Sequence, residues 1–471
     1  MLFNSFEFLL FFPLVYSLYL LLKHQWQNRL LIAASCLFYA AWNWKFLGVM
    51  FVSITTDYFC SRWIDRSQDP RVRKRFLLLS IFVNLSILGF FKYFNFFAAN
   101  FGELFCALHL TSSAAYTPLK IILPLGISFY TFEAISYTVD VYRRQTKPAQ
   151  KYSDYLLFVI YFPHMIAGPI MRAKNFLPQI TSQRIVTTEL FYEGCFLFFW
   201  GIFEKMFVAD NLAKVVNPVF AASAPYEGGA ILLAIYAFSF QIFCDFDGYS
   251  NMARGLGKCM GFEITINFKL PYFATNPREF WQRWHISLST WLRDYLYIPL
   301  GGNRNGKGHM YMALLVTMLL GGLWHGASWT FVVWGAYQAT LLIVHRIFTK
   351  PDERPKGQHP FKYFLKIIFF FHLVVLGWLF FRAQSFGQIV NMLQALMFNF
   401  RFNQQDLSLW IKSAGFVLPL LAIQIWQFKS NDLIILFKQH WLLKTIVYAF
   451  LTYLVLGWGI MKTEEFIYFQ F

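Results

Sequence analysis

A single histidine in a long apolar run is the most reactive feature of this sequence. Residues 310–344 contain no Asp, Glu, Lys or Arg, and His325 is the one side chain among them that titrates near neutral pH. A straight helix of this length would reach about 52 Å, which exceeds the roughly 30 Å hydrocarbon layer of a membrane. Gly321, Gly322 and Gly326 flank the histidine and are natural break points. We therefore predict two shorter helices within residues 310–348 that meet near a buried His325.

An ionisable residue inside a membrane segment is a functional candidate by default. A neutral imidazole at this point could act as a general base near pH 7. The alternative is a structural histidine that is hydrogen-bonded to a neighbouring helix. Metal chemistry is disfavoured because the sequence has no HExxH motif, and Glu279 and Asp294 are the carboxylates near the candidate histidines. Both fall on the polar face of one predicted helix, so we predict no metal site.

A second histidine, His285, lies in residues 262–309, a segment rich in Arg, Trp and Tyr. Asn276 and Pro277 resemble a helix start, and the apolar spacing predicts an amphipathic helix from Glu279 to Leu296 with His285 on its apolar side. This helix could lie on the bilayer surface with His285 in its packing, or its polar face could line a water-filled funnel.

The glycine-rich stretch at residues 301–308 is a near match to a phosphate-binding loop. Gly308 stands where the Mg²⁺-binding hydroxyl would be needed, so we interpret the stretch as a turn. Arg304 and Lys307 within it could still attract an anionic ligand.

The composition indicates what surrounds these residues. The chain has 471 residues, of which 57% are hydrophobic, 21% aromatic and 14% charged, whereas soluble domains carry about 25% charged residues. We predict an all-α polytopic membrane protein with about ten to twelve transmembrane or re-entrant helices. The formal net charge of +17 comes from short basic clusters between apolar runs, which is typical of cytoplasmic loops rather than of nucleic-acid binding.

The charges also predict orientation and domain organisation. Lys23 and Arg29 follow the first apolar run, so the N-terminus is expected outside the cytoplasm. Glu464 and Glu465 follow the last run, so residues 462–471 are expected to form an aromatic tail on the same outer side. Residues 1–471 show no repeat or separate soluble domain, and we predict a single membrane domain.

Several motifs carry a family resemblance over nearly the whole chain. N-F-K-L-P-Y at residues 267–272, F-W-Q-R-W-H at 280–285 and G-G-L-W-H-G-A-S-W at 321–329 are similar to the membrane-bound O-acyltransferase family. G-P-I-M-R at 168–172 and D-F-D-G-Y-S-N-M-A at 245–253 resemble its branch of alginate O-acetyltransferase membrane subunits and peptidoglycan O-acetyltransferases.

This resemblance implies an acyltransferase with helices around a central tunnel. His325 matches the family's catalytic histidine, and His285 matches its second characteristic histidine. In this branch the donor substrate is expected to be cytosolic acetyl-CoA, with no bound cofactor. We expect donor contacts from basic, polar and aromatic residues of the central segments, namely Arg283, Arg293, Asn303, Arg304 and Trp324.

The chain's last residues, F-I-Y-F-Q-F, resemble a C-terminal F-x-Y-x-F motif of cell-envelope acylation systems. The resemblance implies that Tyr468 accepts the acyl group and passes it to a periplasmic SGNH-type acetyltransferase, which modifies alginate-like exopolysaccharide or peptidoglycan outside the bacterial inner membrane. From the residues alone, the favoured interpretation of the tail is an interfacial aromatic belt.

Other functions remain as alternatives. One is D-alanyl or another acyl transfer to a cell-envelope polymer. Another is a transporter. This alternative is less favoured because the chain shows no inverted repeat and few carboxylates in its apolar runs.

Overall fold

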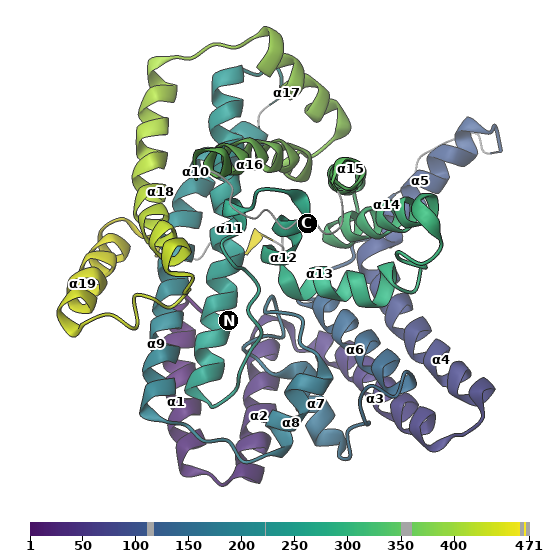
Figure 1. Cartoon of the computed structure of the whole chain (residues 1–471). Helices are drawn as coiled ribbons and strands as arrows, with labels where there is room; N and C mark the ends of the chain where they lie inside the picture. The colour runs from purple at the N-terminus through teal and green to yellow at the C-terminus, as the bar shows by residue number, and fades with distance from the viewer. Residues whose placement is uncertain (111–116, 222, 350–359, 462–465, 468–471) are drawn as a thin grey trace. The chain divides into compact units, whose positions relative to one another are not determined.

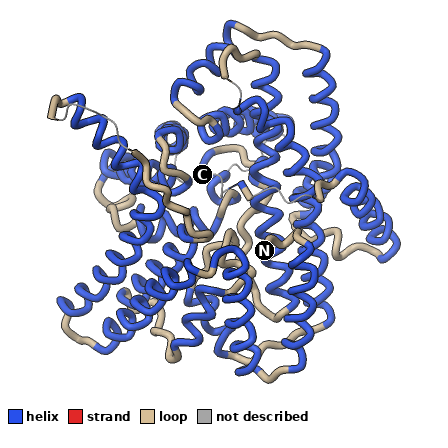
Figure 2. The backbone as a smooth tube through the Cα atoms, turned by 180° about the vertical axis from the view of Figure 1, so that it is seen from behind, coloured by secondary structure: helices blue, strands red, loops and turns tan. Residues whose placement is uncertain are grey.

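The computed structural model describes the chain except for residues 111–116, 222, 350–359, 462–465 and 468–471. Among the described residues every regular element is a helix and none is a strand, as Figure 2 shows. This confirms the predicted all-α class. The chain forms two compact units, and the predicted single domain over residues 1–471 stays a prediction. The first unit comprises Met1–Phe191, Gly257–Thr265 and Gly326–Ser328, and the second comprises Tyr192–Leu256, Ile266–His325 and Trp329–Phe471.

The first unit is a set of packed helices with a buried polar network. In its interior Asn84 donates to both carboxylate oxygens of Asp57, at 2.9 and 3.0 Å, and thereby connects two helices. A buried carboxylate of this kind requires several hydrogen-bond donors because burial removes its hydrating water molecules. The helices are α1 (Phe6–Leu21), α2 (His24–Asn43), α3 (Lys45–Arg66), α4 (Pro70–Leu88), the π-helical turn η1 (Gly89–Tyr93), α5 (Phe94–Ala107), α6 (Ile127–Tyr142), α7 (Tyr152–Ile160) and α8 (Ala173–Thr181).

The second unit holds both candidate histidines. Two long helices, α9 (Thr188–Ile202) and α11 (Gly228–Cys259), belong partly to each unit. The remaining elements are η2 (Phe203–Ala209), α10 (Asp210–Ala221), η3 (Pro271–Phe273), α12 (Pro277–Arg283), α13 (Ile286–Leu292), η4 (Arg293–Tyr297), α14 (Gly306–His325), α15 (Trp329–Phe348), α16 (Pro360–Arg382), α17 (Phe386–Phe398), α18 (Gln404–Ser430) and α19 (Trp441–Trp458), most of which Figure 1 labels.

Six helical stretches within the described residues are long and apolar enough to cross a membrane. They are Pro70–Ala107, Gly228–Cys259, Trp329–Phe348, Pro360–Arg382, Asp406–Ser430 and Trp441–Trp458. Two shorter apolar helices, α1 and α17, add to them. The membrane-embedded character is confirmed, whereas the expected ten to twelve spanning or re-entrant helices and their central tunnel stay predictions.

The predicted break beside His325 is confirmed. Helix α14 ends at His325 itself, and α15 starts at Trp329, so the apolar run forms two shorter helices. Gly322 on α14 and Gly335 on α15 lie where the helices meet. A Cβ atom on Gly322 would collide with the carbonyl oxygen of Phe331, and one on Gly335 with that of Met318. Small residues therefore let the two backbones approach closely.

The predicted helix from Glu279 to Leu296 is wrong, although its start is confirmed. Asn276 caps the Glu279 N–H and Pro277 occupies the first turn, but α12 ends at Arg283. The chain then breaks at Trp284 and His285 before α13. The reason is tertiary: the Ile286 N–H donates to the carbonyl oxygen of Asn267 at 2.9 Å, and the Arg283 carbonyl accepts from the Lys269 N–H at 2.9 Å. A segment outside any helix, residues 267–269, thus satisfies backbone groups that a continuous helix would have paired.

Candidate active site

His325 lies in an aromatic cage within the second unit. Its side chain is buried, and its ring centroid is 5.0 Å from that of Trp324, 5.1 Å from that of Trp334 and 5.2 Å from that of Phe381. All three rings meet the imidazole edge to face, a favourable arrangement for aromatic pairs. Helices α14, α15 and α16 each contribute one wall of this cage, so the imidazole is held in a defined orientation away from bulk water.

Trp324 connects the two histidines. Its ring centroid is 5.9 Å from that of His285 and 5.0 Å from that of His325. The structure therefore brings His325, His285 and Trp324, three of the residues named from the sequence, into one cluster. This grouping is compatible with a catalytic pair, and the individual roles stay predictions.

His285 occupies a strained backbone position. It precedes the first residue of α13 with φ 43° and ψ 55°, the left-handed region, which is uncommon for residues other than glycine. Such strain costs about 1–3 kcal/mol and persists where the surroundings impose it. Here Asn267 is the constraint, since its backbone carbonyl and side chain both bind residues 285–287.

Asn267 also determines which nitrogen of His285 carries the proton. Its Oδ1 atom accepts hydrogen bonds from the Ser287 backbone N–H at 3.2 Å and the Ser287 hydroxyl at 3.0 Å. The same oxygen lies 3.2 Å from His285 Nδ1. Because this atom acts as an acceptor for Ser287, His285 Nδ1 must be the donor, and in the neutral ring Nε2 then carries the lone pair. His285 is therefore buried and hydrogen-bonded, and the choice between the two interpretations of segment 262–309 stays open.

Burial keeps His285 neutral. It lies outside the six candidate spans, and its side chain is fully buried. Desolvation lowers its pKa to about 3, because burial disfavours the charged imidazolium. A neutral ring of fixed tautomer can orient a neighbouring group or a substrate without adding a charge.

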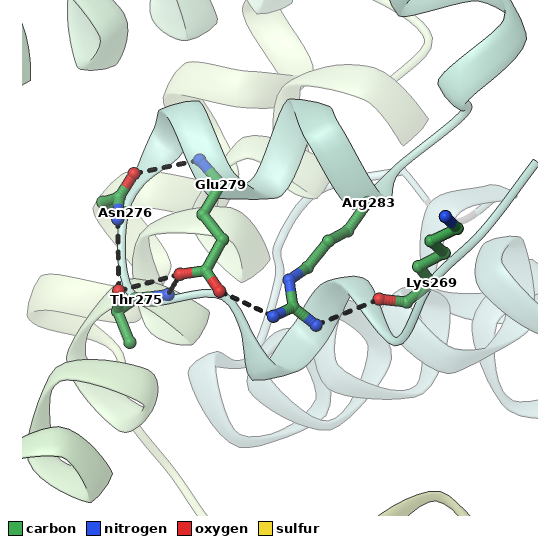
Figure 3. A network of polar contacts seen from close by, with 5 residues as sticks. All are labelled: Lys269, Thr275, Asn276, Glu279 and Arg283. Carbon is green, nitrogen blue, oxygen red and sulfur yellow. Dashed lines mark hydrogen bonds and ion pairs between the residues drawn. The ribbon is translucent and has the colours of Figure 1, made fainter. Parts of the chain in front are cut away.

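Arg283, the last residue of α12, belongs to a polar network that joins both ends of this helix to the preceding residues, as Figure 3 shows. Its guanidinium donates to Glu279 Oε1 at 2.8 Å and to the carbonyl oxygen of Lys269 at 3.2 Å. Glu279 Oε2 accepts from the Thr275 backbone N–H and hydroxyl, both at 2.8 Å. Arg283 therefore connects Lys269 with Glu279, and its predicted contact with the donor stays a prediction.

Three further predicted donor contacts lie on η4 and the turn that follows it, whereas Trp324 lies on α14. Arg293 Nε is 2.7 Å from Asp294 Oδ1, and the side chain is largely exposed. Asn303 Oδ1 accepts from the Tyr297 hydroxyl at 2.6 Å and from Arg346 at 3.1 Å. Arg304 is exposed in the same turn. These residues present positive charge at the surface of the second unit, a property that suits an anionic ligand.

Tyr468 lies outside the described residues, but the two residues before it are described. Phe466 and Ile467 are each 2% exposed. The Ile467 backbone N–H donates to Asp245 Oδ2 on α11 at 2.7 Å. Phe466 and Ile467 are therefore buried inside the second unit.

Sequence reasoning missed Asn267, Lys205 and Asp245. Asn267 is the first residue of the N-F-K-L-P-Y motif, and its residue type and spacing alone indicate no role. Lys205 and Asp245 are charged residues within apolar runs, and such residues are functional candidates in membrane proteins. That signal was available, but the pairing of Lys205 with Asp245 follows from helix packing alone.

The described residues thus form a helical membrane fold in which two buried histidines contact one tryptophan. The family model described as MBOAT, membrane-bound O-acyltransferase family, matches residues 8–386. The chain belongs to this family, and it is therefore an enzyme, an acyltransferase.

Curated relatives share most of the chain's length. The probable alginate O-acetylase AlgI of Azotobacter vinelandii is 43% identical over 405 residues, covering 85% of this chain and 78% of the relative. The peptidoglycan O-acetyltransferase of Helicobacter pylori is 34% identical over 429 residues, covering 84% and 80%. The teichoic acid D-alanyltransferase of Bacillus subtilis is 27% identical over 340 residues, covering 66% and 85%. The predicted resemblance is thus confirmed, and the family disfavours the transporter alternative.

Proposed function

We propose that this protein transfers an acetyl group from cytosolic acetyl-CoA toward an exported polysaccharide. The proposal rests on one observation above all: His325 is buried at the end of α14 and shares Trp324 with His285. The names of relatives 43% and 34% identical to this chain, an alginate O-acetylase and a peptidoglycan O-acetyltransferase, support acetyl as the group. D-alanyl transfer is the second candidate, supported by the relative at 27% identity.

The proposed chemistry is base-assisted attack on a thioester. The His325 imidazole takes the proton of an acceptor hydroxyl, and the hydroxyl oxygen attacks the acetyl carbonyl carbon. The carbon–sulfur bond then breaks, and the departing CoA thiolate recovers the proton from the imidazolium. His285 would orient the site through Trp324, while Arg283, Arg293, Asn303 and Arg304 would contact the donor. Acetyl-CoA is a substrate here, and no bound cofactor is needed.

The acceptor in this proposal is the hydroxyl of Tyr468. The acetyl-tyrosine would pass its acetyl group to a periplasmic SGNH-type acetyltransferase, which would modify an alginate-like exopolysaccharide or peptidoglycan. This route requires a multi-pass protein of the bacterial cytoplasmic membrane with both chain ends on the outer side. The charges flanking the first and last apolar runs support that orientation.

The proposal can be tested with the full-length protein in lipid nanodiscs. The quantity measured is the rate at which it transfers a radiolabelled acetyl group from acetyl-CoA. His325→Ala should lower the transfer rate by about 10²–10⁴-fold, the contribution of a general base. His372→Ala, which changes an exposed histidine on α16, should retain activity. Full turnover by His325→Ala would overturn the assignment of the base, and transfer from a D-alanyl carrier protein but not from acetyl-CoA would favour the second candidate.

The relay has a separate test in cells. Tyr468→Phe should abolish polymer acetylation while protein level and acetyl-CoA binding stay intact. Full polymer acetylation by this variant would remove the relay but leave the transferase.

A further inference from the structure

The last residue of α19 and two described residues after it are hydrogen-bonded to other elements of the second unit. Asn211 on α10 donates to the carbonyl oxygen of Trp458 at 2.8 Å, and the Ile460 N–H donates to the carbonyl oxygen of Met206 at 3.1 Å. Farther along, the Ile467 N–H donates to Asp245 Oδ2 at 2.7 Å. These contacts come from η2, α10 and α11, so three separate elements position the chain end.

The third contact involves a buried charge. Asp245 is 3% exposed, and its Oδ1 atom lies 2.6 Å from Lys205 Nζ. The same ammonium lies 2.9 Å from Asp210 Oδ1. Two carboxylates thus share one ammonium in a buried site, and charges there need additional hydrogen bonds to offset desolvation. The Ile467 N–H supplies such a bond, of the charge-assisted kind.

The same stretch of α11 also binds the tail's aromatic ring. Phe466 is 2% exposed, and its ring centroid lies 5.3 Å from that of Tyr249 and 5.8 Å from that of Phe246. Asp245 and Tyr249 are four residues apart and lie on one helix face. This face therefore offers an acceptor for the tail's backbone and an aromatic surface for its side chain.

The aromatic surface continues to the candidate site. The Phe246 ring is in contact with Phe466 on one side, and its centroid lies 4.5 Å from that of His285, edge to face. A single phenylalanine thus separates the docked tail from the second histidine. The position of the tail and the surroundings of His285 are coupled through packing.

We propose that Asp245, held by Lys205, is a positioning residue that docks the chain's own C-terminal segment beside His285. Its consequence for catalysis rests on the function proposed above, in which the residue after Ile467 in the sequence, Tyr468, accepts the acetyl group. Asp245 acts through the tail's backbone and does not touch the reacting atoms. The competing explanation is that Asp245 serves as a purely structural partner for Lys205.

Photo-crosslinking in the full-length protein separates these explanations. With p-benzoylphenylalanine in place of Phe466, illumination should attach the tail to the α11 peptide that contains Tyr249, as read by mass spectrometry. Ile467→Pro removes the N–H that binds Asp245 and leaves the Lys205 pairs untouched. We expect the crosslink yield to fall about tenfold, in keeping with loss of one hydrogen bond to a charged group. Ile467→Val keeps the N–H and should keep the yield.

A second pair of variants tests Asp245 itself. Asp245→Leu removes the acceptor and should lower the yield as Ile467→Pro does, and the double variant should show no further loss because both changes remove one interaction. Asp210→Asn, which alters the other carboxylate at Lys205, should leave most of the crosslink. Equal losses in Asp210→Asn and Asp245→Leu would instead support the purely structural role and overturn the proposal.

Kinetics give an independent readout. Ile467→Pro should leave the KM for acetyl-CoA unchanged and lower the rate of tail acetylation. An unchanged crosslink yield in Ile467→Pro would overturn docking by Asp245 whatever the activity. A full polymer acetylation rate in Tyr468→Phe, with the crosslink intact, would overturn the relay alone. Failure of the docking proposal and failure of the relay proposal are therefore distinguishable.

Discussion

The Nδ1 atom of His285 lies 3.2 Å from the Oδ1 atom of Asn267, a residue 18 positions earlier in the chain. The same oxygen accepts two hydrogen bonds from Ser287, which follows the histidine. The turn at His285, its left-handed backbone and the tautomer of its ring therefore depend on one amide side chain. His285 in turn contacts Trp324, so this amide supports the surroundings of His325.

Removal of that amide should destabilise the site. In Asn267→Ala, the buried His285 Nδ1–H and the Ser287 donors lose their shared acceptor, and each unsatisfied buried donor costs about 1–3 kcal/mol. We expect a lower thermal unfolding temperature in nanodiscs together with reduced acetyl transfer. Asn391→Ala changes an exposed asparagine within α17 and serves as the control. Wild-type stability of Asn267→Ala would contradict the role assigned to the amide.

The neutral state of His285 predicts a specific pH behaviour. Since burial lowers its pKa to about 3 from an ordinary 6.5, the unfolded chain binds more protons than the folded one between these values. The free energy of unfolding should therefore decrease as the pH falls from 6.5 toward 3, and this residue should contribute no pH dependence above that window.

NMR of protein labelled in its histidine rings measures this directly. The His285 signal, identified by its loss in His285→Gln, should not shift between pH 8 and pH 5, whereas histidine signals of the denatured protein should titrate near 6.5. A His285 signal that titrates near 6.5 in the folded protein would show that the ring is not sealed as described.

Close approach of α14 and α15 should make Gly322 intolerant of a side chain. The Cβ of Gly322→Ala would collide with the Phe331 carbonyl, so α14 must move and His325 with it. We expect lower thermal stability and a loss of acetyl transfer. Gly308→Ala is a matched control on the same helix, since nothing lies within 4 Å of its Cβ position, and alanine favours helix over glycine. Equal behaviour of the two variants would exclude the packing explanation.

The exposed basic residues before α14 should act in donor binding rather than in chemistry. Arg293→Gln and Arg304→Gln each remove one positive charge that could attract the phosphates of acetyl-CoA. We expect a several-fold higher KM for acetyl-CoA with an unchanged kcat, a pattern that indicates loss of uniform binding. Arg401→Gln, exposed and outside residues 262–309, should leave the KM unchanged. A lower kcat without a change in KM would assign these arginines a different role.

Composition and local pattern determined the helical membrane class, the break beside His325 and the start of α12. Each depends on properties that short stretches carry by themselves: apolar length, glycine flexibility and the capping chemistry of Asn276 and Pro277. The family motifs identified His325 and His285 as candidate site residues. In the structure the rings of both histidines lie next to that of Trp324.

Tertiary structure alone decided three features. They are the helix break at His285, the pairing of Lys205 with Asp245 and the hydrogen bond between Ile467 and α11. Local periodicity predicted a continuous helix through His285, because it takes no account of the backbone groups of residues 267–269 that compete for the same hydrogen bonds. Likewise, Asp245 and Ile467 lie 222 positions apart. Interactions over such distances depend on how helices pack, and no local spacing in the sequence encodes them.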